Sequence, residues 1–176
     1  MDHFLEEIVV KKNRTVNEML YVLSMVVMVI AAIYAMMMLQ MLFLDFDWFT
    51  LVTVVLSAGI AVLLFLRRGQ LRTEYEYTFT NGDMDFAMVF NNQKRKTLGT
   101  MRVRNVEAFG PVNGASFKRY VTMKDVKTSN WFLNRGAELY FFYFAKENSK
   151  RIIVIEPSAE MVELIKKYLP RGAYQQ

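Results

Sequence analysis

Few residues in the sequence have the types and spacing that catalysis needs. The chain contains no cysteine, which excludes disulfides, thiolate metal sites and cysteine nucleophiles. Its single histidine, His3, lies near the N-terminus, and the sequence has no serine-elbow, phosphate-loop, metalloprotease or dinucleotide-binding motif. Asp83 and Asp85 could pair as carboxylates, but a solvated strand face beside a turn explains them better. We therefore predict no enzymatic activity, no metal and no cofactor.

The basic residues carry a clearer chemical signal. From Arg67 to Gln176 the sequence has 19 lysines and arginines against 11 aspartates and glutamates, a net charge of +8. Each base close to an anionic bilayer contributes about 1 kcal/mol of attraction. The candidates for contact with anionic lipid headgroups are Arg67, Arg68, Arg72, Lys94, Arg95, Lys96, Arg102 and Arg104. An alternative stays open, in which these bases only set membrane topology and keep the domain soluble. Nucleic acid is not expected as a partner, because the bases are dispersed and no recognition motif accompanies them.

Two apolar segments that precede most of these bases are predicted to cross a lipid bilayer. They comprise residues 19–44 and 49–66, and the only acids or bases between Met19 and Leu66 are Asp45 and Asp47. A transmembrane helix needs about 20 residues, so the first segment is long enough and the second is near the lower limit. Because only residues 45–48 separate the two segments, we expect an antiparallel helical hairpin over residues 19–66.

The charges that flank this hairpin predict its orientation. Lys11, Lys12 and Arg14 precede the first helix and three arginines follow the second, whereas the connecting turn carries two aspartates and no base. Cytoplasmic flanks are enriched in lysine and arginine, which places both termini in the cytoplasm and the turn outside. We therefore expect a multi-pass protein of the plasma membrane.

Residues 1–18 are predicted to form an amphipathic N-terminal segment. Between residues 2 and 12, Phe4, Leu5, Ile8 and Val9 fall on one face of a helix. This pattern favours a short amphipathic helix that lies on the membrane or on the C-terminal domain. A frayed terminus stays open as the alternative.

After Arg72 the hydrophobic period changes from helical to alternating, which predicts a β-rich cytoplasmic domain over residues 73–176. The expected strands cover residues 75–80, 84–90, 96–103, 138–145 and 151–156, with turns at 81–83, 91–93 and 147–149 and a continuation of the third strand at 106–109 after a bulge. Residues 111–130 show no clear pattern, so a loop, a short helix and an edge strand all stay open there. Residues 158–169 predict an amphipathic helix, capped by Ser158, whose apolar stripe covers the open end of the sheet.

Antiparallel strands closed by one C-terminal helix resemble the plan of a pleckstrin-homology-like (PH-like) domain. The expected fold class is therefore α+β, with an N-terminal transmembrane hairpin followed by an antiparallel, PH-like domain that a C-terminal amphipathic helix closes. Three stretches, MDHFLEEIVVKKN, YEYTFTNGDMDFAMVFNNQKRK and RIIVIEPSAEMVELIKKYLP, also resemble one domain-of-unknown-function family of small uncharacterised bacterial membrane proteins with this architecture. The resemblance covers the whole chain, and it implies an architecture without implying an activity.

These features together predict a membrane-anchored, non-enzymatic interaction module. Its cytoplasmic domain is expected to bind a protein partner, from the membrane or the cytoplasm, or the anionic surface of the membrane. The alternative is a structural or assembly subunit of a membrane protein complex, in which the transmembrane helices carry the specificity.

Overall fold

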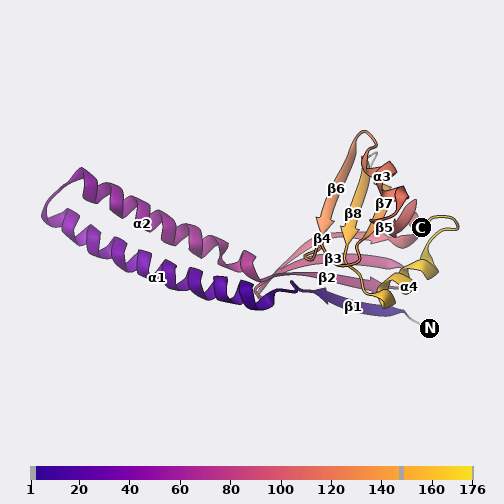
Figure 1. Ribbon diagram of the computed structural model, residues 1–176, viewed down its shortest axis with the longest axis horizontal. Coiled ribbons are helices and arrows are strands. Elements are labelled where there is room, and N and C mark those ends of the chain that lie inside the picture. Colours follow the sequence, from indigo (N-terminus) through magenta and orange to yellow (C-terminus); the bar gives the residue numbers. More distant parts are fainter. Residues whose placement is uncertain (1–2, 147–148, 176) are drawn as a thin grey trace. The chain divides into compact units, whose positions relative to one another are not determined.

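The computed structural model describes residues 3–146 and 149–175, which form two compact units (Figure 1). A helical unit comprises residues 13–73 together with the short turn 90–92, and a β-rich unit comprises the rest. Glu147 and Asn148, which belong to the turn predicted at 147–149, lie outside the described residues.

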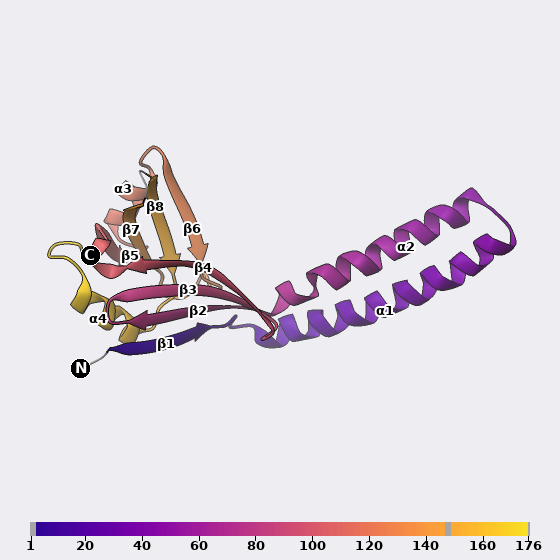
Figure 2. The same ribbon diagram turned by 180° about the vertical axis from the view of Figure 1, so that it is seen from behind.

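The helical unit is a hairpin of two long apolar helices. Helix α1 (Arg14–Leu44) and helix α2 (Trp48–Arg67) lie side by side, and a short 3-10 helix, η1 (Arg68–Arg72), follows them (Figures 1 and 2). Both helices are long and apolar enough to cross a membrane. The backbone N–H of Thr50 donates to the Asp47 side chain over 3.0 Å, which caps the second helix at the turn.

Small side chains bring the two helices together. Ala35 and Ser57 are the buried residues of the two helices, and small residues allow helix backbones to approach closely in an apolar environment. The Ser57 hydroxyl donates to the Thr53 carbonyl over 2.7 Å, so its burial leaves no unpaired polar atom. Gly59, by contrast, has open space around it, and it is not part of this contact.

The β-rich unit begins with a strand where we expected an amphipathic helix. Residues Phe4–Val9 form β1, which pairs antiparallel with β2 (Thr73–Thr80), with Phe4 opposite Thr80 and Val9 opposite Tyr75. The helical prediction was therefore wrong. A helix of so few residues is marginal in water, whereas pairing with β2 satisfies the backbone hydrogen bonds along one edge of the segment.

The first sheet has the strand order β1-β2-β3-β4, with β3 at Asp83–Phe90 and β4 at Lys94–Arg102. The predicted Asn-Gly turn joins β2 to β3, and both of its central residues have positive φ, 49° at Asn81 and 98° at Gly82. Such turns match the twist of paired strands. Strands β2, β3 and β4 thus lie where the sequence predicted strands, at 75–80, 84–90 and 96–103.

The second sheet departs from the predictions in two ways. Its order is β5-β7-β8-β6, with β5 at Ala108–Pro111, β6 at Val126–Trp131, β7 at Tyr140–Lys146 and β8 at Ser149–Ile155. A 3-10 turn, η2 (Val103–Asn105), follows β4, and β5 pairs with β7, so residues 106–109 do not continue the third strand as we expected. In addition, β6 pairs parallel to β8, so the domain is not purely antiparallel.

Residues 111–130, for which a loop, a short helix and an edge strand were all open, contain both a short helix and an edge strand. Helix α3 (Ala115–Val121) occupies the centre of this stretch, and β6 forms an edge strand at its end.

Helix α4 (Ala159–Tyr168) closes the core between the two sheets, as predicted (Figure 2). Its Met161, Val162 and Ile165 are buried, and Ser158 caps it by accepting the backbone N–H of Met161 over 3.2 Å. The buried aromatic residues that share this core come from both sheets and include Tyr77, Phe79, Phe86, Phe109 and Phe142.

Candidate functional site

The structure places the predicted lipid-contacting bases in two groups. Arg67 ends α2, and Arg68 and Arg72 lie in η1, so all three belong to the helical unit. The second group belongs to the β-rich unit, with Lys94, Arg95, Lys96 and Arg102 on β4 and Arg104 in η2.

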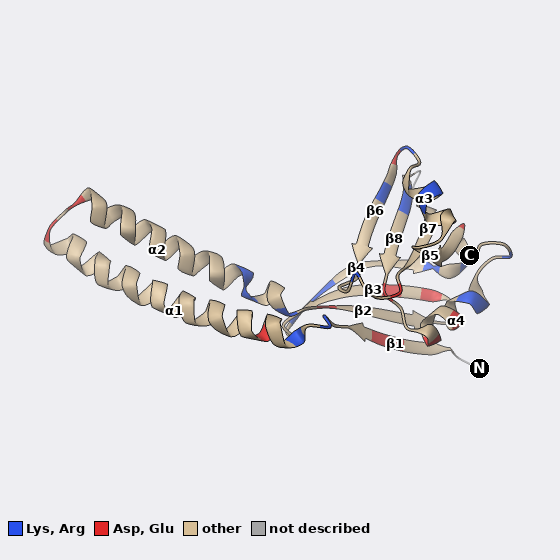
Figure 3. Ribbon diagram, in the orientation of Figure 1, with Lys and Arg blue, Asp and Glu red and all other residues tan. Residues whose placement is uncertain are grey.

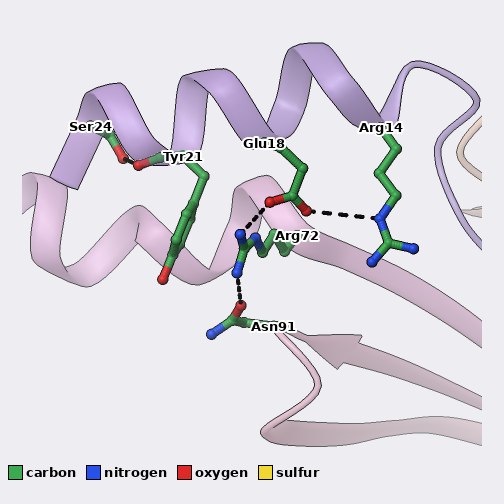
Figure 4. A network of polar contacts seen from close by, with 6 residues as sticks. All are labelled: Arg14, Glu18, Tyr21, Ser24, Arg72 and Asn91. Atoms are coloured by element: carbon green, nitrogen blue, oxygen red, sulfur yellow. Dashed lines mark hydrogen bonds and ion pairs between the residues drawn. The ribbon is translucent and has the colours of Figure 1, made fainter.

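Arg72 is the centre of a polar network at the base of the helical hairpin (Figure 4). Its guanidinium donates to the Glu18 carboxylate and, over 3.1 Å, to the Asn91 side chain. It also lies 3.8 Å from the ring centroid of Tyr21, a favourable cation–π contact. Glu18 contacts Arg14 as well, at 3.8 Å. The charge of Arg72 is therefore compensated within the protein.

Arg95 is likewise paired with an acid. Its guanidinium lies 2.5 Å from the carboxylate of Glu76, a residue of β2 that is only 6% exposed. Because β3 lies between β2 and β4 in the sheet, this ion pair crosses a whole strand. Burial raises the pKa of Glu76, a hydrogen bond with the Glu6 side chain raises it further, and the positive charge of Arg95 opposes both effects.

Asp83 and Asp85 do not pair with each other. Asp83 contacts Arg102 at 3.7 Å, and Asp85 accepts a hydrogen bond from the Thr100 hydroxyl. Asp83 and Arg102 border an open cleft of about 420 Å³ between β4 and β7. Its lining also includes Met101, Asn105 and Phe144. Each aspartate thus binds a neighbour on the adjacent strand.

The remaining predicted bases have no acidic partner among the residues that the structure describes. These bases are Arg67, Arg68, Lys94, Lys96 and Arg104. The guanidinium of Arg68 packs 4.3 Å from the ring centroid of Phe65. Their positive charge is available to an outside partner.

A further basic surface was missed by the sequence analysis. Helix α3 packs on the second sheet through Phe117 and Tyr120, whose ring centroids lie 5.3 Å from Phe141 and 4.5 Å from Tyr143. The opposite side of this short helix is exposed. We define the α3 face as the exposed residues Lys118, Arg119, Val121 and Lys124, together with Lys150 of β8.

Lys150 belongs to the α3 face because strand alternation places it there. Ile152 and Val154 pack in the cluster that α3 covers, and alternate residues of a strand point to the same side of the sheet. Figure 3 shows the colour of lysine and arginine on α3, on the loop before β6 and on β8. The i, i+3 spacing of Phe117 and Tyr120 was the available signal, but seven helical residues are too few for a periodic pattern.

Comparison with known proteins supports the architecture. A family model described as "Bacterial PH-like domain (DUF6106)" matches residues 1–175 of the chain. No curated protein and no solved structure matches the chain.

Proposed function

The chain belongs to the bacterial PH-like domain family (DUF6106), and from this membership we propose that it is a membrane-anchored, non-enzymatic interaction module. PH-like domains are generally binding modules for lipids or proteins and not enzymes. In this proposal the helical hairpin spans the membrane, and the β-rich unit binds a protein partner or the anionic membrane surface.

The exposed apolar surface of the hairpin is the observation that carries the proposal. Only one residue of each helix is buried, while large apolar side chains such as Met19, Ile30 and Leu63 are about half exposed or more. A patch of this extent on a water-soluble protein is a liability, whereas the hydrocarbon core of a bilayer would cover it. Charged residues lie only at the two ends of the hairpin (Figure 3).

The same charge distribution supports an orientation with both termini in the cytoplasm. Asp45 and Asp47 occupy the turn, and Arg14, Arg67 and Arg68 lie at the opposite end of the helices. Positive flanks favour the cytoplasmic side. The module is thus proposed to be a multi-pass protein of the plasma membrane whose β-rich unit faces the cytoplasm.

Ion pairing divides the predicted lipid-contacting bases into two classes. Arg72, Arg95 and Arg102 already contact carboxylates, so lipid would have to displace an internal partner. Among the predicted lipid-contacting bases, we therefore assign lipid contacts to those without an acidic partner, which are Arg67, Arg68, Lys94, Lys96 and Arg104.

Single cysteines test the topology directly, because the natural sequence has none. Asp45→Cys places a thiol in the turn and Gln175→Cys places one near the C-terminus. In whole cells, a membrane-impermeant thiol reagent should label Asp45→Cys before permeabilisation and Gln175→Cys only after it. The opposite pattern would reverse the orientation, and extraction of the protein by alkaline carbonate would refute membrane insertion.

An apolar groove between the helices favours the assembly-subunit alternative. It has a volume of about 390 Å³, and its lining includes Met28, Ala32, Met36, Ala61 and Phe65. Crosslinking in native membranes should recover a reproducible protein partner if the module binds one. Replacing the hairpin with an unrelated one then separates the two functions, since a module keeps this partner and an assembly subunit loses it.

A further inference from the structure

We propose that the α3 face docks on the anionic lipid headgroups of the bilayer that holds the hairpin. This inference rests on the proposed function, and it assigns the docking to residues outside the predicted lipid-contacting set.

Helix α3 is anchored on the second sheet, and one of the bases on its exposed face, Arg119, is held by a neighbouring ring. Besides Phe117 and Tyr120, Met123 packs on the cluster of the second sheet that includes Phe141 and Tyr143. The guanidinium of Arg119 lies over the ring of Tyr120, 4.7 Å from its centroid, and donates to its hydroxyl over 2.8 Å. Docking would therefore not have to order the backbone of α3 or the side chain of Arg119, which lowers its entropic cost.

The charge of the α3 face is not compensated within the protein. None of its four bases forms an ion pair among the described residues. The adjacent acid is Asp125, which follows Lys124 in the loop before β6. This surface differs from β4, where Glu76 and Asp83 bind two of the bases.

An exposed apolar side chain lies among these bases. Val121, the last residue of α3, is 41% exposed, and Lys118 precedes it by one helical turn. An apolar residue surrounded by lysine and arginine is suited to the boundary between headgroups and acyl chains, where the bases contact phosphate and the apolar group enters the bilayer. This combination favours a lipid surface over an acidic protein segment.

The acids of the first sheet strengthen the case for one docking face. Glu6, Glu74 and Asp85 lie on β1, β2 and β3, on the side of the sheet away from the core, and form no ion pair among the described residues. Anionic lipid repels such a surface and attracts the α3 face, so the membrane field would orient the domain. The chain also passes directly from Lys12 into the hairpin, which gives the domain a high effective concentration at the membrane.

The test uses the full chain, reconstituted in bilayer discs, with a fluorophore on Val121→Cys as its single thiol. The discs contain either phosphatidylcholine alone or phosphatidylcholine with an equal part of phosphatidylglycerol, and both carry a quencher on the lipid. We expect the fluorophore to lose emission in the anionic discs and to keep it in the neutral ones. Because screening shortens from about 10 Å at 0.1 M salt to about 3 Å at 1 M, high salt should restore the emission.

Matched charge reversals identify the face that docks. The variant K118E/R119E/K124E should abolish quenching in anionic discs, whereas R135E/K167E/R171E, which reverses three exposed bases of the same unit that belong neither to the α3 face nor to the predicted lipid-contacting set, should leave it unchanged. Equal loss in both variants would show that net charge and not the α3 face is responsible. Quenching that is equal in both lipids, or absent from both, would also overturn the inference.

The proposed function is checked on the same samples. If the protein co-elutes with the discs and resists carbonate but its fluorophore is not quenched, the inference fails while the membrane anchor stands. If the protein does not enter the discs, the proposed function itself fails.

Discussion

Arg95 of β4 binds Glu76 of β2 at 2.5 Å, across the intervening strand β3. The pair links β2 to β4 on the outer side of the first sheet, and the hydrogen bond between Glu76 and Glu6 extends it to β1. A buried carboxyl that shares a hydrogen bond with a second carboxyl holds its proton more tightly than in the unfolded chain. The stability of the β-rich unit should therefore depend on pH through Glu76.

We predict that Glu76→Gln removes a pH dependence of stability. Since the pKa of Glu76 is raised above its ordinary 4.5, the folded state binds more protons than the unfolded state just above that pH. The free energy of unfolding of the natural protein should then fall as pH rises from about 4.5 through the raised pKa. Urea unfolding at a series of pH values, followed by the fluorescence of Trp131 in a Trp48→Phe background, measures this slope.

The control for this prediction is Glu74→Gln on the same strand, which should keep the slope of the natural protein. If the free energy of unfolding changed with pH equally in Glu76→Gln and in the natural protein, the carboxyl of Glu76 would not be the group that causes the pH dependence.

Arg72→Lys is expected to destabilise the helical hairpin by about 2 kcal/mol, the size of a lost hydrogen bond to a charged group. A lysine ammonium is a compact charge that cannot reproduce the planar fork contacting both Glu18 and Asn91. Thermal unfolding in detergent, followed by helical circular dichroism, should show a lower midpoint. Arg67→Lys alters an exposed arginine of the same unit, and an equal loss in that variant would contradict the prediction.

Tyr77→Phe should cost the β-rich unit about 1–3 kcal/mol, because it removes the hydroxyl that bonds two half-buried backbone groups. The Tyr77 hydroxyl donates to the carbonyl of Trp131 and accepts the backbone N–H of Glu156 at 3.3 Å. Tyr75→Phe is the matched control, since its hydroxyl is 3.4 Å from the Asn130 carbonyl and its loss should cost less. Urea midpoints that ranked the two variants in the opposite order would argue against this network.

Gly82→Ala is predicted to destabilise the turn between β2 and β3 by about 1–3 kcal/mol, the usual cost of a residue held in a disfavoured backbone conformation. Gly82 has a φ of +98°, and an added Cβ would lie 2.7 Å from Cδ1 of Tyr168. Gly136→Ala serves as control, because nothing lies within 4 Å of its Cβ position. Similar unfolding midpoints for the two variants would contradict both the backbone strain at this positive φ and the clash with the ring of Tyr168.

Local patterns in the sequence determined the elements that need no distant partner. The two apolar helices can be predicted from the sequence because their composition alone distinguishes them from a water-soluble domain. The turn at Asn81 and Gly82 can be predicted because few residue types accept positive φ. Helix α4 can be predicted because its apolar stripe, its serine cap and the following proline all indicate the same helix. The resemblance to PH-like domains rested on the same local signals, and the family match supports it.

Tertiary structure decided everything that depends on residues far apart in the chain. Residues 4–9 carry a pattern compatible with a helix, and they form a strand because β2, some 70 residues later, offers a ladder of hydrogen bonds. The parallel pairing of β6 with β8 is likewise set by the sheet and not by the sequence of β6.

The availability of each base was also decided by the tertiary structure. Arg72 and Glu18 are 54 residues apart, and Arg95 and Glu76 are 19 apart, so no sequence window contains the acid that compensates either base. Conversely, the α3 face gathers bases from a helix, a loop and a strand that only folding brings together. Net charge can be counted in a sequence, but the fraction that remains free for a partner depends on which charges the fold places in contact.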